Sequence, residues 1–222
     1  MGDYYASRLS GERLRRCYDL APPRVRQYLD AEVQHVSSKV NAWHRVLELG
    51  CGYGRVLAEL APRASHVVGI DTSPDSLLLA GRLLNGLRMD LCLMSAACLA
   101  FARHTFDVVA CIQNGLSVFG VDPVRVLREA VRVTRPGGRV LLSSYSDTFW
   151  PQRLEWFELQ AREGLVGELD RERTTRGTIV CKDGFQANTL TPEAFGSLAR
   201  EIGLRPGLEE VDGSSLFCEL SP

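Results

Sequence analysis

The sequence predicts an α/β protein whose sheet is mostly parallel and covered by helices on both faces. Short apolar runs alternate with stretches of helical periodicity through the first two thirds of the chain. These runs are nearly continuous, which is typical of strands buried on both faces. Strands separated by helices form parallel sheets, because a helical crossover returns the chain to the same edge.

Two helices are predicted before the first strand, over residues 8–20 and 24–40. Pro22 and Pro23 suit the first turn of the second helix. Its apolar residues step along the chain by 3, 1, 4, 3 and 4 positions, which places them on one helix face. They are Val25, Tyr28, Leu29, Val33, Val36 and Val40.

The middle of the chain predicts five strands, alternating for the most part with helices. The strands are expected at 45–50, 66–71, 87–94, 106–112 and 139–145, and the helices at 54–61, 73–86 and 122–134. Ser73 followed by Pro74 is an N-terminal helix signal. The last of these helices is expected to end at Pro136-Gly137-Gly138.

The chain changes character after the fifth strand, where residues 146–190 form an insertion rich in aromatic and charged side chains. A helix is predicted near 151–163 and a hairpin over 177–190. A helix over 191–203 and closing strands near 206–211 and 215–220 complete seven strands. In the inserted helix, periodicity predicts a core stripe of Trp150, Leu154, Phe157 and Ala161, and solvent exposure for Arg153, Glu155, Gln160 and Arg162.

The amino-acid composition excludes several classes of function for this protein. Hydrophobic residues make up 45% of the 222 residues, which suits one domain, and the net charge of −1 provides no field for nucleic acid. No apolar run reaches the ~18 residues of a membrane span, and no signal peptide is visible. Seven Cys without a CxxC pair and four His without ligand spacing predict no metal and a reducing, cytoplasmic setting. The sequence leaves open whether the protein forms a homodimer.

A glycine-rich turn joins the first strand to the next helix. The segment ELGCGYGR (48–55) holds Gly50, Gly52 and Gly54, where the missing Cβ atoms let a ligand reach the backbone at a helix N-terminus. The spacing G-x-G-x-G differs from the G-x-G-x-x-G of NAD-binding turns. Asp71 ends the second strand, where a carboxylate can accept hydrogen bonds from ribose hydroxyls. A nucleoside-type cofactor is therefore predicted.

These segments together resemble a known family. VLELGCGYGRVLAELA, VVGIDTSPDSLLLA, FDVVACIQN and RPGGRVLLSS are similar to class I S-adenosylmethionine-dependent methyltransferases, most clearly over 45–145. The resemblance implies a Rossmann-like fold, S-adenosyl-L-methionine as cofactor and S-adenosyl-L-homocysteine as product. The cofactor-binding positions that it implies are Tyr18, Glu48, Gly50, Cys51, Gly52, Gly54, Asp71, Thr72, Ser95 and Ala96. Gln113, at the end of the fourth strand, is a further candidate, because its amide can position either the methionine carboxylate of the cofactor or a polar acceptor.

One position departs from the family pattern. An acidic residue is usual after the third strand, where it contacts the adenine amine, and this chain has Ser95 followed by Ala96. A serine hydroxyl is neutral and shorter, so a weaker adenine contact is expected. The backbone N–H of Ala96 remains available.

The resemblance also divides the single domain 1–222 into functional parts. Residues 1–42 are expected to be an N-terminal helical lid, 43–145 the cofactor-binding core, 146–190 a lid over the acceptor, and 191–222 the closing helix and strands. The acceptor should lie above the carboxyl ends of the strands. Candidate residues in contact with it are Tyr5, Tyr18, Gln113, Asn114, Tyr145 and Trp150, of which Tyr18, Asn114 and Tyr145 are the catalytic candidates. Asp147 and Phe149 either line this site or anchor the inserted helix.

The expected reaction is direct in-line methyl transfer to a small-molecule acceptor, with the acceptor atom (O, N, S or C) open. The segment QNGL lacks the [DNS]-P-P-[YFW] tetrad of many amino-group methyltransferases. Two alternatives remain: an RNA or protein methyltransferase that uses the Arg-rich N-terminus, and a catalytically degenerate adenosylmethionine-binding partner protein.

Overall fold

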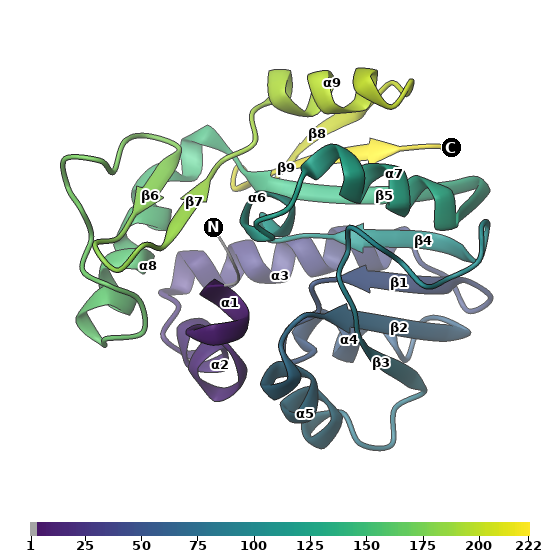
Figure 1. The fold of residues 1–222 in the computed structure, drawn as a ribbon, viewed down its shortest axis with the longest axis horizontal. Helices are drawn as coiled ribbons and strands as arrows, with labels where there is room; N and C mark the ends of the chain where they lie inside the picture. The colour runs from purple at the N-terminus through teal and green to yellow at the C-terminus, as the bar shows by residue number, and fades with distance from the viewer. Residues whose placement is uncertain (1–3) are drawn as a thin grey trace.

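A seven-stranded sheet forms the centre of the computed structural model, which describes residues 4–222 (Figure 1). The strand order is β3-β2-β1-β4-β5-β9-β8. β1 to β5 are parallel, and β9 runs antiparallel to both of its neighbours. The strands are β1 Arg45–Leu49, β2 His66–Asp71, β3 Met89–Leu93, β4 Phe106–Cys111, β5 Thr134–Tyr145, β8 Gly207–Val211 and β9 Ser215–Leu220. The predicted mostly parallel, Rossmann-like sheet is confirmed.

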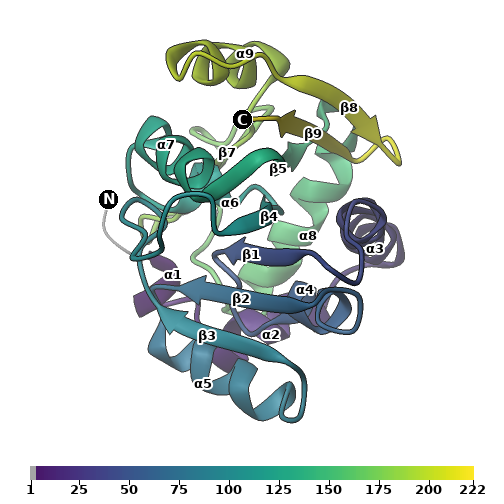
Figure 2. The same ribbon diagram turned by 90° about the vertical axis from the view of Figure 1, so that its right-hand side faces the viewer.

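Helices cover both faces of this sheet (Figure 2). On one face, α7 and α9 contribute Val126, Ala130 and Phe195 to a core with the strands. On the other, α3 and α4 contribute Val36 and Leu57. The helices are α1 Tyr4–Ser7, α2 Gly11–Asp19, α3 Pro23–Ser38, α4 Arg55–Leu60, α5 Pro74–Leu83, α6 Gly115–Val118, α7 Pro123–Val133, α8 Trp150–Arg162 and α9 Pro192–Glu201, with a 3₁₀ turn at Asp147–Phe149.

The local signals that predict these helices act as expected. Ser73 caps α5 by accepting from the Ser76 N–H, and Thr191 caps α9 by accepting from the Ala194 N–H. A boundary prediction differs at β5, which begins at Thr134, ahead of Pro136-Gly137-Gly138. The register between β4 and β5 shifts there, so the strand absorbs the breaker residues as an irregularity.

The N-terminal helices and the insertion pack together at the carboxyl end of the sheet (Figure 1, left). The insertion consists of α8 and a separate hairpin of β6 Thr178–Val180 and β7 Gln186–Asn188. Leu9 and Cys17 from the N-terminus share a buried cluster with Phe157, Ile179 and Phe185 from the insertion. We call this cluster the lid core. It places two segments far apart in the sequence over one edge of the sheet.

The predicted polar face of α8 is partly wrong, because Arg153 and Gln160 are buried. Arg153 Nη1 donates to Thr189 Oγ1 at 2.6 Å, and Nη2 donates to the Ala187 carbonyl at 2.8 Å. The hairpin thus covers a second side of α8 and offers backbone acceptors to the guanidinium. Of the predicted core stripe, Phe157 is buried, whereas Trp150, Leu154 and Ala161 are only partly buried against the lid core. Glu155 and Arg162 are exposed as predicted.

Candidate functional site

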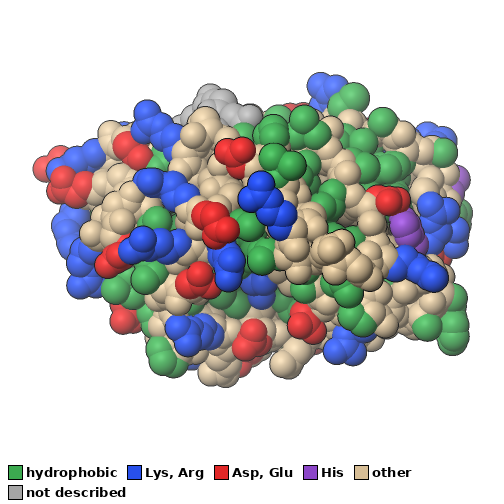
Figure 3. All heavy atoms as spheres, turned by 90° about the horizontal axis from the view of Figure 1, so that it is seen from below, with side chains coloured by type: hydrophobic (Ala, Val, Ile, Leu, Met, Phe, Trp, Pro, Cys, Tyr) green, Lys and Arg blue, Asp and Glu red, His purple; other side chains and the backbone are tan. Residues whose placement is uncertain are grey.

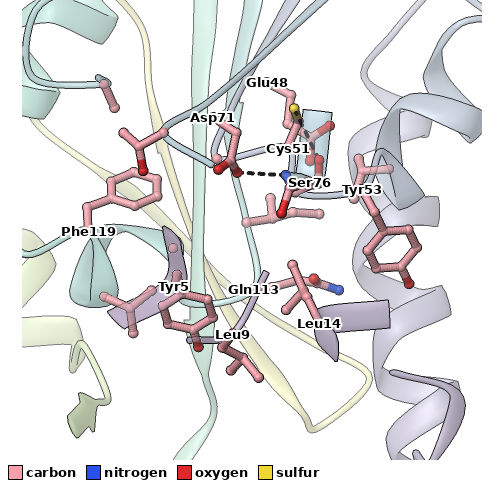
Figure 4. A pocket seen from close by; sticks show the side chains of 18 of the residues that line it. Tyr5, Leu9, Leu14, Glu48, Cys51, Tyr53, Asp71, Ser76, Gln113 and Phe119 are labelled. Atoms are coloured by element: carbon pink, nitrogen blue, oxygen red, sulfur yellow. Dashed lines mark hydrogen bonds between the residues drawn. The ribbon is translucent and has the colours of Figure 1, made fainter. Parts of the chain in front are cut away.

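A cavity of about 370 Å³ lies between the carboxyl ends of the strands and the N-terminal helices (Figure 4). It collects every residue predicted to bind the cofactor except Gly54. Residues that line it are Tyr5, Leu9, Leu14, Tyr18, Glu48, Gly50, Cys51, Gly52, Tyr53, Arg55, Asp71, Thr72, Ser76, Met94, Ser95, Ala96, Ile112, Gln113 and Phe119, among others. The sheet therefore brings together positions that are far apart in the sequence, as a topological switch point does.

The glycine loop forms the floor of this cavity. The N–H groups of Gly50 and Cys51 donate to the Ile70 carbonyl, which ties the loop to β2. Gly52 has a φ of +54°, and a Cβ there would lie 3.0 Å from the Leu14 side chain. A larger residue at position 52 would thus strain the backbone and fill the space under α2, the helix that carries Leu14.

Gly54 has a different role from the one the sequence predicts. It is the N-cap of α4 with a φ of +87°, and a Cβ there would lie 2.5 Å from Leu84 Cδ1. The absence of a side chain at Gly54 therefore lets the loop pack closely on the α5 segment, and Gly54 does not line the cavity.

Asp71 faces the loop from the end of β2. Its Oδ2 accepts from the Gly52 N–H at 2.8 Å, and its Oδ1 accepts from the Ser73 N–H at 2.8 Å. The carboxylate is thereby oriented at the cavity wall beside Thr72. A carboxylate offers about four lone-pair sites, so it retains capacity for ribose hydroxyls.

Two charged side chains in the cavity have buried polar atoms without a hydrogen-bond partner. They are Glu48, at Oε2, and Arg55, at Nε and Nη2. Glu48 is only 4% exposed, and burial raises the pKa of its carboxyl to about 8, against an opposing effect of Arg55. Sequence reasoning missed Arg55. A cation in the first turn of a helix opposes the helix dipole, and that unfavourable placement is the signal that could have identified it.

Gln113 and Asn114 both have positive φ, of 57° and 61°, at the end of β4. Gln113 lines the cavity, accepts from Tyr18 Oη at 2.8 Å, and leaves its own Nε2 buried without a partner. Asn114 instead bridges Ser144 and the Asn188 carbonyl, at 2.7 and 2.9 Å. The structure therefore places the Asn114 side chain in a strut between β5 and the hairpin, away from the cavity.

Ser95 and Ala96 lie at the far end of the cavity, after β3. Ser95 Oγ accepts from the Ala97 N–H at 3.3 Å, so the hydroxyl belongs to a local turn. Phe119 covers the floor nearby, since its ring lies 2.6 Å from the position a Gly50 Cβ would take. Aromatic and thioether side chains such as Phe119 and Met94 give this end an apolar character.

A smaller recess of about 40 Å³ continues from the main cavity between the lid and α3. Tyr5, Tyr18 and Gln113 line both spaces, and Tyr28, Tyr145, Trp156 and Phe157 are further walls of the recess. The N-terminal helix, the end of β4 and the insertion thus meet here. Trp156 Nε1 donates to the Cys17 carbonyl at 2.9 Å and closes the contact between the insertion and the lid helix.

The other candidates after β5 lie outside the recess. Asp147 is exposed and pairs with Arg176 at 2.8 Å. Phe149 is buried against Tyr28, with ring centroids 4.9 Å apart, and Trp150 packs on the lid core. These residues therefore anchor the inserted helix.

No cluster of His, Cys, Asp and Glu within residues 4–222 has the arrangement of a metal site. All seven cysteines are free thiols. None of the helices in the described part of the chain combines the length and the apolar character that crossing a bilayer requires.

The fold, the glycine loop and the acid at the end of β2 are the features that the resemblance to class I methyltransferases implies. Residues 46–138 of this chain match the family model described as a methyltransferase domain.

Among its relatives is a ubiquinone biosynthesis O-methyltransferase from Stutzerimonas stutzeri, 32% identical over 57% of this chain and 52% of that protein. The chain spans about half the length of the curated relatives it matches. A solved SAM-dependent methyltransferase from Aquifex aeolicus has a TM-score of 0.64 with 15% identity, over 92% of this chain and 96% of the other. The solved [4+2]-cyclase SpnF is 26% identical with a TM-score of 0.51, over 55% and 47% of the two chains.

Proposed function

We propose that this protein transfers a methyl group from S-adenosylmethionine to a small-molecule acceptor. The observation that carries the proposal is the pairing of a glycine floor with unpartnered buried polar atoms in one cavity. Buried polar groups are normally hydrogen-bonded, so Glu48 Oε2 and the Arg55 guanidinium indicate a ligand with groups of both charges.

The residues present fit this cofactor. Glu48 would accept from the methionine ammonium, and Arg55 would donate to the methionine carboxylate. Asp71 would accept from the ribose hydroxyls, and the floor at Gly50 and Gly52 would allow the cofactor to approach the backbone. The adenine would occupy the end of the cavity near Ser95, with the Ala96 N–H as donor.

When bound, the cofactor supplies a methyl group on positively charged sulfur, which is a strong electrophile. The chain must then orient an acceptor in line and exclude water. Leu14 of α2 and Leu9, in the turn between α1 and α2, cover the cavity, and Tyr18 closes it against Gln113. This arrangement supports a reaction without a covalent enzyme intermediate.

The acceptor atom that we propose is oxygen, because the relatives that share the core are named O-methyltransferases. Two features favour a small molecule over RNA or protein. Two arginines of the N-terminal segment are engaged with the insertion, since Arg13 Nε donates to the Leu165 carbonyl at 3.0 Å and Arg16 pairs with Glu163 at 2.8 Å. Figure 3 shows basic and acidic side chains interspersed over one face of the molecule.

Transfer of a radiolabelled methyl group tests this proposal. The protein would be incubated with labelled S-adenosylmethionine and, in parallel, with a panel of phenols, with tRNA and with a cell-protein fraction. We expect label in the phenols alone. Label that enters only tRNA or protein would contradict the small-molecule assignment. Cofactor binding without any transfer would favour the degenerate partner protein.

A further inference from the structure

Resting on the proposed function, we propose that Tyr28 and Glu32 form a proton relay for an acceptor that carries a hydroxyl on a planar ring. The acceptor hydroxyl would lie between Tyr28 Oη and Gln113 Nε2, where the aromatic recess joins the main cavity, since Gln113 lines both spaces. The acceptor is thus a phenol-like compound, and two residues of α3 act on its proton.

The side chains that line the recess determine the shape of the ligand that it can hold. Tyr18, Tyr145, Trp156 and Phe157 surround it. Trp156 meets the Tyr18 ring edge-on at a centroid distance of 5.8 Å. Aromatic side chains favour a flat apolar ligand. The recess has room for a few atoms only, so it would take one edge of a ring whose remainder lies in the main cavity.

Two polar atoms in these walls have no hydrogen-bond partner. Tyr28 is fully buried, and its Oη, which can donate and accept, makes no hydrogen bond of regular geometry, although it lies close enough to Glu32 and Tyr145 to oppose the rise that burial causes in the pKa of both. Gln113 Nε2 is unpaired as well, because the Tyr18 hydroxyl occupies the other end of that amide. A hydroxyl between them would accept from Gln113 Nε2 and donate to Tyr28 Oη.

Glu32 lies directly behind Tyr28. The two residues are four positions apart on α3, so they share one helix face. Glu32 is fully buried, and its Oε1 accepts from Ser143 Oγ at 2.5 Å and from Ser215 Oγ at 3.1 Å. Its Oε2 has no partner. Ser143 Oγ also accepts from the Gln113 N–H at 2.8 Å, which connects the carboxyl to the same turn.

The surroundings of Glu32 suit a group that gains and loses a proton near neutrality. Burial raises the pKa of its carboxyl to about 7, while Ser143, Arg55, Ser215 and Tyr28 act in the opposite direction. Arg55 faces it from α4, and Tyr145 and Cys111 face it from β5 and β4. The ionised carboxylate would therefore form in the range where a base is useful.

Two proton transfers accompany the methyl transfer. The acceptor O–H proton moves to Tyr28 Oη as the Tyr28 proton moves to Glu32 Oε2. The acceptor oxygen keeps the electron pair that forms the new O–CH₃ bond, and the electrons of the broken S–CH₃ bond remain on sulfur. Once the product has left, Glu32 returns the proton through Tyr28 to the emptied recess, and Tyr28 ends the cycle neutral.

Catechol is a suitable probe, with binding measured by calorimetry on protein saturated with S-adenosylhomocysteine. Tyr28→Phe keeps the ring but removes the hydroxyl, and we expect catechol to bind about 5- to 10-fold more weakly. Its affinity for S-adenosylhomocysteine should not change. Tyr4→Phe is the matched control, because Tyr4 lines neither space and its hydroxyl donates to Asp183 on the exposed side of the lid.

Glu32→Gln separates a proton relay from a structural strut, since the amide can still bond both serines. We expect catechol affinity to be retained, while methyl transfer to catechol falls at least about tenfold and no longer rises with pH near 7. Failure of the wild type to bind S-adenosylhomocysteine would instead contradict the proposed function itself. The relay is contradicted if the wild type binds S-adenosylhomocysteine but not millimolar catechol, or if Tyr28→Phe binds catechol as the wild type does. It is also contradicted if Glu32→Gln keeps the rate and its pH dependence.

Discussion

Tyr18 Oη donates a hydrogen bond to Gln113 Oε1 at 2.8 Å, which joins the lid helix α2 to the end of β4 above the cavity. The Tyr18 ring also lies over the Arg55 guanidinium, 5.5 Å from its Cζ. Tyr18 thus contacts both Gln113, at the edge of the cavity, and the guanidinium of Arg55 inside it. This contact relates the N-terminal segment directly to the cofactor core.

Tyr18→Phe should weaken S-adenosylmethionine binding by about 1 kcal/mol, the usual net contribution of one hydrogen bond. The ring remains in place, so the lid core should stay folded. Isothermal titration calorimetry measures the effect, and an unchanged affinity would show that the lid contact is irrelevant to the cofactor. This substitution is a more specific test than deletion of residues 1–18, because that deletion would expose the lid core to solvent.

Asp71→Ala should weaken cofactor binding by about 1.5–3 kcal/mol, the range for hydrogen bonds to a charged group. Two effects combine, since the ribose loses its acceptor and the Gly52 N–H loses the carboxylate that orients the loop. Calorimetry on the folded variant is the measurement. If Asp71→Ala binds as tightly as the wild type, the ribose lies elsewhere.

Ser95→Asp should keep or increase cofactor affinity. A carboxylate accepts from an exocyclic amine about twice as strongly as a neutral hydroxyl does, whereas its desolvation opposes the gain. Ser95 is only partly buried, so the desolvation effect should be the smaller one. A large loss of affinity would show that the pocket is built around serine.

Glu48→Gln should change how stability depends on pH. The pKa of Glu48 is raised from 4.5 to about 8 in the folded protein, so its stabilising effect is full below about pH 4.5 and is lost as pH rises through 8. A tenfold difference in proton affinity between the folded and unfolded states corresponds to about 1.4 kcal/mol. Urea unfolding at mildly acidic and alkaline pH should therefore show a loss of a few kcal/mol in the wild type that the variant lacks. Equal pH dependence of the two proteins would contradict the buried, ionisable Glu48.

Much of the fold follows from local signals in the sequence. The caps at Ser73 and Thr191 and the unbroken apolar strands predict nearly every element. The glycine spacing with Asp71 also predicts the floor of the cavity and the wall beside it. These features can be predicted because each depends on a few neighbouring residues and on one regular period.

The parts that sequence reasoning missed depend on contacts between distant segments. Periodicity assigns Arg153 to solvent, because the hairpin that receives its hydrogen bonds is more than twenty residues away in the chain. Glu32 interrupts the apolar face of α3, and that interruption is a readable signal of a buried polar network. Its partners Ser143 and Ser215 come from strands far along the chain, so the network itself could not be predicted.

The most direct test of the cofactor site is a calorimetric titration of wild type, Gly52→Val and Gly86→Val with S-adenosylhomocysteine. Gly86 also has a positive φ, of +90°, but open space around its Cβ position, so it controls for backbone strain outside the cavity. We expect binding at a single site in the wild type and in Gly86→Val, and no detectable binding in a folded Gly52→Val. Equal affinity of all three proteins would contradict the assignment of the glycine loop as the floor of the cofactor site.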